Sequence, residues 1–124
     1  MAIQSIPVAP EHALDRADDS VDLLLDSGRL PGQVLVLTTG EHHPWQLHEE
    51  SFGANHYWAQ LSEGADVFYA DALQCRPARR EVVVLAVNGG DPADLRSAFS
   101  AAVDRATRLV VVCGEAGSLP AQDG

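Results

Sequence analysis

Three runs of consecutive apolar, mostly β-branched residues constrain the fold of this chain more than any other feature. They are VLVLT (34–38), VVVLAV (82–87) and LVVVC (109–113). Such continuous runs are typical of strands that are buried on both faces of a sheet. Because helical patterns separate them, we expect a mostly parallel sheet covered on both sides. The sequence therefore predicts a three-layer α/β/α domain with about four strands.

The segments between these runs supply the predicted helices. A first amphipathic helix should begin at Pro10 and end at Gly28, because its apolar residues recur at helical spacing. Residues 45–60 predict one helix, or two helical pieces broken near Gly53, and residues 67–72 a short strand. After the second apolar run, Asp91 is a good N-cap for a helix that extends to about Thr107. We expect residues 10–114 to form one domain, with a flexible irregular arm at 1–9 and a loose polar tail at 115–124.

Charge restricts the partners of this chain. Its 124 residues contain eight arginines, no lysine and eighteen acids, which gives a net charge of −10. Such a charge repels phosphate backbones and so counts against autonomous nucleic-acid binding, whereas a basic protein partner or self-association is favoured. Without lysine, no phosphate-binding GK[ST] loop can exist in this sequence. Any ATP and Mg²⁺ would therefore have to be shared with a partner domain, and we expect no cofactor for this chain alone.

The N-terminal residues and the cysteines predict a cytoplasmic, reduced protein. No signal peptide is evident, and no apolar run approaches the roughly 20 residues of a membrane span. The two cysteines show no CxxC spacing, and Cys113 is expected to be a buried small apolar residue. Cys75 stands beside Arg76, which would lower the pKa of its thiol, but the sequence supplies no base for it.

Three segments carry a resemblance to a known family. They are PGQVLVLTTGEHHP, DVFYADALQCRPARREVVVLAVNG and SAFSAAVDRATRLVVVCGE. Their order, spacing and strand context resemble the second RecA-like domain of UvrD-like superfamily 1 helicases, in which the second segment carries a KGLE-type element. The third resembles the family's final motif, Y-V-x-L-S-R-A-R followed by a strand. The resemblance covers about residues 10–114 and implies a RecA-like fold.

The resemblance implies one catalytic candidate and four nucleotide-binding candidates. The arginine of the family's final motif stabilises charge on the γ-phosphate, and Arg105 stands at its position. The nucleotide-binding candidates are Thr38, Thr39, Arg76 and Arg79. Within the KGLE-type element, lysine, glycine and glutamate are replaced by Arg76, Pro77 and Arg79.

One of these replacements, and two others, argue against the family's chemistry. Pro77 fixes φ and removes an N–H donor. Asp104 replaces the serine before Arg105 and weakens the local positive field, and Ser100 stands where a tyrosine is usual.

Structural explanations compete with each of these roles. Arg105 lies in the last turn of the predicted helix, where the helix dipole favours any cation. The arginines at 76, 79 and 80 are typical of an exposed loop. His42, His43 and His48 match no metal-ligand spacing, so no metal is expected, and residues 88–91 are best explained as a turn followed by a helix cap.

Three functions remain open on this sequence. The first is a stand-alone, degenerate helicase domain that acts as a binding or regulatory module without catalysis of its own. The second is the C-terminal half of a split or truncated ATP-dependent DNA helicase, in which Arg105 completes an active site in trans. The third is a small α/β metabolite-binding protein with a pocket at the carboxyl ends of its strands, lined by Thr38, Thr39, Asp71 and Asn88.

Overall fold

The computed structural model describes residues 1–115 and has a five-stranded, entirely parallel sheet. The strand order is β1-β5-β4-β2-β3. The strands are β1 (Ala2–Pro7), β2 (Val34–Thr38), β3 (Phe68–Asp71), β4 (Arg80–Ala86) and β5 (Ala106–Gly114). The helices are α1 (Ala13–Asp26), α2 (Pro44–Glu50), α3 (Ala54–Glu63) and α4 (Pro92–Arg105), with 3-10 turns η1 (Pro10–His12) and η2 (Pro31–Gln33).

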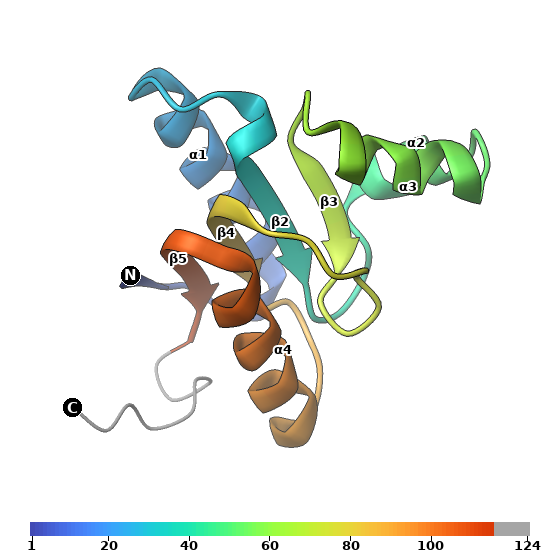
Figure 1. Ribbon diagram of the computed structural model, residues 1–124. Coiled ribbons are helices and arrows are strands. Elements are labelled where there is room, and N and C mark those ends of the chain that lie inside the picture. Colours follow the sequence, from blue (N-terminus) through green and yellow to red (C-terminus); the bar gives the residue numbers. More distant parts are fainter. Residues whose placement is uncertain (116–124) are drawn as a thin grey trace.

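Alternating side chains of the central strands divide the core between two faces of the sheet. On β2, Val34 and Val36 pack in the cluster that contains the buried residues of α1. Leu35 and Leu37 pack in the opposite cluster, with residues of α3, α4 and the 72–78 segment. Both α1 and α4 contact β4 directly, and they lie on opposite sides of the sheet (Figure 1). The predicted three-layer α/β/α architecture is confirmed.

The N-terminal segment differs from the prediction. Residues 1–9 were expected to form an irregular arm, but β1 pairs in parallel with β5, from Ala2 opposite Leu109 to Pro7 opposite Gly114. Its side chains are mostly exposed because it lies at the edge of the sheet. It therefore lacks the continuous apolar run that marks the inner strands. The described sheet accordingly has five strands rather than about four.

The predicted helices are present, with shifted ends. The first helix, expected from Pro10 to Gly28, is α1 (Ala13–Asp26), and the 3-10 turn η1 precedes it. Residues 45–60 form two helices, and the break falls at Gly53, whose φ of 104° is in the region that favours glycine. Asp91 caps α4 by accepting a hydrogen bond from the backbone N–H of Asp94 at 2.8 Å. The helix ends at Arg105, slightly before the predicted end near Thr107.

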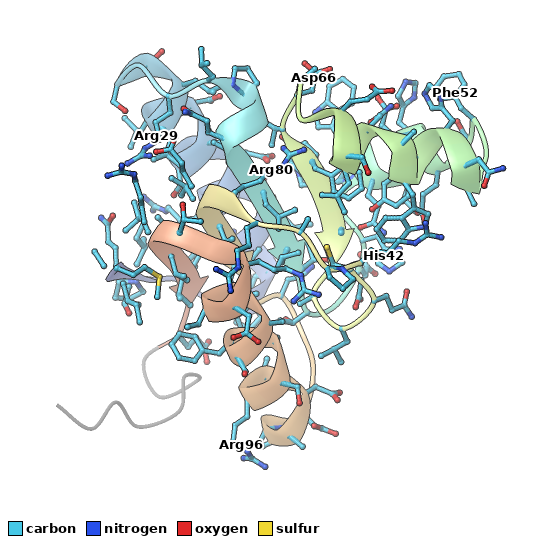
Figure 2. The ribbon with its side chains drawn as sticks, viewed as in Figure 1. Arg29, His42, Phe52, Asp66, Arg80 and Arg96 are labelled. Atoms are coloured by element: carbon cyan, nitrogen blue, oxygen red, sulfur yellow. The ribbon has the colours of Figure 1, made fainter. Side chains whose placement is uncertain are left out.

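Arg80 is buried, whereas the sequence grouped it with exposed loop arginines. Its guanidinium donates to the carbonyls of Val34 at 2.9 Å and Asp66 at 2.6 Å, and to the last turn of α3 through Gln60 and Leu61, both at 3.5 Å. Figure 2 shows Arg80 inside the molecule, near the ends at which β2 and β3 begin. Its donors connect three elements, which explains how a charged group is accommodated there.

Both cysteines are free and buried, and the burial predicted for Cys113 is confirmed. Within residues 1–115, no helix has both the length and the apolarity that a membrane crossing needs. The predicted polar tail at 115–124 falls, apart from Glu115, outside the described residues.

Candidate functional site

The predicted site residues fall at three separate places in the fold. Thr38 and Thr39 end β2 at the carboxyl edge of the sheet. Arg76 lies over the ring of Trp58. Arg79 and Arg105 line one groove, near the end of α4. Among candidates that are distant in the sequence, the structure therefore brings together only Arg79 and Arg105.

At the carboxyl edge, the loops after β2 and β4 bind each other. The side-chain oxygen of Asn88 accepts hydrogen bonds from the backbone N–H groups of Thr39 (3.1 Å) and Gly40 (2.7 Å), and its amide donates to the Glu41 carbonyl (2.9 Å). The Thr39 hydroxyl donates to the Gly89 carbonyl at 2.6 Å. A Cβ atom at Gly40 would lie 2.6 Å from the Asn88 carbonyl oxygen, so glycine is needed for this close approach.

The other two residues of the predicted metabolite pocket, Thr38 and Asp71, are buried or contact other residues of the chain. Thr38 is fully buried. The Asp71 carboxylate accepts from the Leu73 N–H at 2.9 Å and lies 3.6 Å from His42 Nε2. The Thr38 hydroxyl has no hydrogen-bond partner among the described residues. The polar groups of Thr39, Asp71 and Asn88 contact neighbouring parts of the same chain.

Arg105 points its guanidinium at backbone carbonyls of its own chain. It donates to Cys75 at 2.6 Å and to Ala101 at 3.3 Å. Its Nε atom is buried, without a hydrogen-bond partner among the described residues. These contacts connect the end of α4 to the loop between β3 and β4, which is a structural role for the arginine.

The groove beside Arg105 has a volume of about 680 Å³ and is lined by Pro77, Ala78, Arg79, Asp104 and Arg105. Two guanidinium groups at this groove favour an anionic ligand, but the Asp104 carboxylate opposes it. Pro77 has no backbone N–H, so it offers no backbone donor to this groove.

Two further loop residues, exposed Arg76 and buried Cys75, have contacts within the chain. Arg76 lies 4.6 Å from the centroid of Trp58, a cation–π contact on α3. Burial raises the pKa of the Cys75 thiol above its ordinary value, although the charge of Arg105 acts in the opposite direction. The expected lowering of that pKa by Arg76 is therefore wrong, because desolvation of the thiolate dominates.

The sequence did not single out the hairpin of α2 and α3, which carries a row of exposed rings. The aromatic row consists of Trp45, His48, Phe52 and His56, and successive rings meet edge to face with centroids 5.2–5.7 Å apart. Trp45 is 55% exposed and Phe52 60% exposed. The row extends away from the sheet to Phe52 at the far end of the hairpin (Figure 2). The spacing of residues 45, 48 and 52 on one helical face was the available signal.

A cavity of about 320 Å³ lies at one end of this row, between the hairpin, η2 and β3. We call it the hairpin pocket, and its lining residues are Pro31, Trp45, Glu49, Gln60, Asp66, Val67 and Tyr69. The Glu49 carboxylate accepts from the Gln60 side chain at 2.7 Å, which connects α2 to α3. Val67 and Tyr69 stand on the strand side of the pocket, since they belong to or adjoin β3.

A buried histidine supports the wall of the hairpin pocket. His43 stacks on Tyr69 with centroids 4.3 Å apart, and its Nε2 lies 2.7 Å from the Asp18 carboxylate of α1. Its Nδ1 accepts from the Trp45 N–H at the start of α2. Burial, together with the negative charges of Asp18 and Asp22, raises the pKa of Tyr69 to about 12.

The three histidines considered for a metal site have different partners. His42 faces Asp71 and Glu50, His43 faces Asp18, and His48 belongs to the aromatic row. Across residues 1–115, no group of three potential ligands is gathered for a metal ion.

No protein-family model matches the chain, and no curated protein matches it at a significant level.

Proposed function

We propose that this chain is a degenerate counterpart of the second RecA-like domain of UvrD-like helicases, and that it acts as a protein-binding or regulatory module without hydrolysing nucleotide itself. The parallel sheet with helices on both faces is compatible with this proposal, although such sheets serve many functions.

The hydrogen bonds of Arg105 are the observation that carries the proposal. A catalytic arginine must direct its donors at a phosphate that is transferred. Two donors of Arg105 are instead hydrogen-bonded to the carbonyls of Cys75 and Ala101. The absence of lysine from the sequence removes the usual cation of a phosphate-binding loop. The isolated chain therefore lacks the groups that ATP hydrolysis requires.

One observation favours the alternative of a split ATP-dependent helicase. Arg79 and Arg105 line the same open groove, and a partner domain that carries a phosphate-binding loop and Mg²⁺-bound ATP would meet two guanidinium groups there. In that case Arg105 would have to exchange the Cys75 carbonyl for a phosphate oxygen.

A pull-down with the tagged chain from its own cell extract, followed by mass spectrometry, tests the two functions. We expect a partner without a phosphate-binding loop, and no ATPase activity from the purified chain. Recovery of a protein with such a loop, and ATPase activity of the pair that Arg105→Ala abolishes, would instead establish the split helicase. ATP turnover by the purified chain alone, lost in Arg105→Ala, would overturn both proposals.

A further inference from the structure

We propose that the hairpin pocket binds an arginine or lysine side chain from a basic segment of a partner protein. This inference rests on the proposed function, since it names the chemistry that the module would recognise. It is carried by an exposed indole ring and two carboxylates around a single cavity.

The aromatic part of the pocket is Trp45. Indole faces attract guanidinium and ammonium groups, especially where water is partly excluded. The same domain already contains such a pair, because Arg76 lies 4.6 Å from the centroid of Trp58. Within residues 1–115, the arginine–aromatic pairs use Trp58 and Phe68, and Trp45 remains 55% exposed. The exposed indole of Trp45 can therefore make the same kind of cation–π contact, and no arginine within residues 1–115 lies over it.

The charged part of the pocket is formed by Glu49 and Asp66. One oxygen of Glu49 accepts from the Gln60 amide at 2.7 Å, and this contact holds the carboxylate in place. The Asp66 carboxylate has no hydrogen bond or ion pair with another described residue, but Arg80, which donates to the Asp66 backbone carbonyl, is close enough to interact with its charge. Asp66 lies at the start of β3, on the side of the molecule where the hairpin lies (Figure 2).

The charge around the pocket excludes an anionic occupant. The chain carries a net charge of −10, and Asp18 and Asp22 are close enough to Tyr69 to raise its pKa. Nucleic acid and free phosphates would meet two carboxylates at the pocket itself. A cation is therefore the complementary ligand.

The aromatic row favours a polypeptide over a free amine. From Trp45 the row continues through His48 to Phe52 and His56, so apolar residues beside a bound arginine or lysine have a surface to contact. A small polyamine would fill the pocket but leave this row uncovered. Exposed aromatic side chains next to a charged pocket are typical of the anchoring regions of protein interfaces.

Calorimetric titration with defined peptides tests the inference. The probe is an acetylated, amidated hexapeptide of alternating leucine and arginine. The matched control has citrulline at every arginine, which removes the charge and replaces one donor nitrogen by an oxygen at nearly the same shape. We expect saturable binding of the arginine peptide, about tenfold or more tighter than the citrulline peptide, because the pocket combines a cation–π contact with two carboxylates. Equal affinity for both peptides, or no saturation at millimolar concentration, would overturn the inference.

Variants distinguish the pocket from the general negative charge. Trp45→Ala should weaken binding about tenfold, and Glu49→Gln with Asp66→Asn should do the same. The matched control is Asp15→Asn with Asp19→Asn on the exposed side of α1, which changes the net charge equally and should alter affinity by less than about twofold. Equal losses in both double variants, or spermidine binding as tightly as the peptide, would count against the proposal.

The same pocket variants separate this inference from the proposed function. Recovery of the partner by Glu49→Gln with Asp66→Asn at wild-type yield would refute the pocket as the contact but leave the binding module intact. Loss of the partner only in the pocket variant supports both. The wild-type chain could also bind the arginine peptide and show ATP turnover that requires Arg105. That result would support the pocket as a binding site and refute the non-catalytic function.

Discussion

Two arginines, at the start of β4 and the end of α4, are used in the opposite way to the aromatic row of the hairpin. Arg80 and Arg105 direct their donors inward, to backbone carbonyls. Trp45 and Phe52, in contrast, leave more than half of their surface exposed. The first region resembles a helicase site in sequence and is structural in its contacts. The second has no such resemblance, yet its groups are available to a ligand.

This difference shows that residue type alone is a weak guide to function. Whether the functional group of a residue already has partners within the chain is a better one. A guanidinium has five donors, so backbone carbonyls can satisfy an arginine such as Arg105, whatever role its position in the sequence suggests. The exposed ring of Trp45 has no comparable internal explanation, and it lies at a pocket with two carboxylates, of which Glu49 is held by Gln60. The predictions below test whether the first region determines stability and the second region determines binding.

The largest expected effect is on stability, at Arg80. Arg80→Ala removes donors from four carbonyls and should lower the free energy of unfolding by roughly 3 kcal/mol or more, since buried acceptors would lose charged donors. Urea unfolding followed by circular dichroism measures this change. The control is Arg79→Ala at the exposed neighbouring position, for which we expect about 0.5 kcal/mol or less. A similar decrease in the free energy of unfolding for both variants would show that the buried hydrogen bonds of Arg80 do not stabilise the fold.

Arg105 should have an intermediate effect. Arg105→Ala should cost about 1–2 kcal/mol, because the Cys75 carbonyl loses a charged donor. Arg105→Lys should recover part of this, as lysine supplies a charge but not the planar fork. Peptide binding at the hairpin pocket should stay unchanged in both variants when measured below their unfolding midpoints. A variant of wild-type stability would remove the structural explanation for this arginine.

Alkaline pH should weaken the folded state through Tyr69. Its pKa is raised from 10.0 to about 12 by burial and by Asp18 and Asp22, so the unfolded chain loses this proton at lower pH than the folded chain does. The stabilisation is complete below pH 10 and is lost as the pH rises from 10 towards 12. Unfolding midpoints measured across this window should fall, and Tyr69→Phe should fall less steeply. Parallel curves for the two proteins would contradict this prediction.

The smallest effects on stability should come from the aromatic row. Phe52→Ala at the end of the hairpin should change the free energy of unfolding by no more than about 0.5 kcal/mol, because 60% of the side chain is exposed. Phe68→Ala is the matched control, since this ring is buried under α3, and it should cost about 3–5 kcal/mol. A large loss in Phe52→Ala would show that the hairpin needs its aromatic row to fold.

The sequence predicted those parts of the fold that depend on local pattern. The apolar runs at 34–38 and 82–87 identified β2 and β4, and Asp91 identified the start of α4, because burial on both faces and helix capping leave local signals. β1 could not be found in this way, since an exposed edge strand carries no such run. The burial of Arg80 was equally hidden, because three neighbouring arginines look alike until their backbone partners are known.

The site was predicted less well than the fold. Arg79 and Arg105, two of the candidates that the resemblance implied, line one groove, and their roles in nucleotide binding and catalysis stay predictions. The sequence could not show which carbonyls Arg105 binds. The hairpin pocket was missed because its walls come from four separate stretches of the chain, around Pro31, Trp45, Gln60 and Asp66. No single stretch has a motif, so only the folded arrangement brings the indole and the carboxylates together.

The position of β1 also affects the order of assembly. β1 is paired with β5 only, and the two strands are separated by almost the whole described chain, so their ladder closes the longest loop of the fold. We expect β1 to join the sheet last and to detach first, with the earliest amide exchange of the five strands. Whenever β1 is detached, the backbone of β5 at 109–114 offers unpaired donors and acceptors to any extended chain nearby. While it stays paired, β1 therefore keeps this edge of β5 from pairing with another chain.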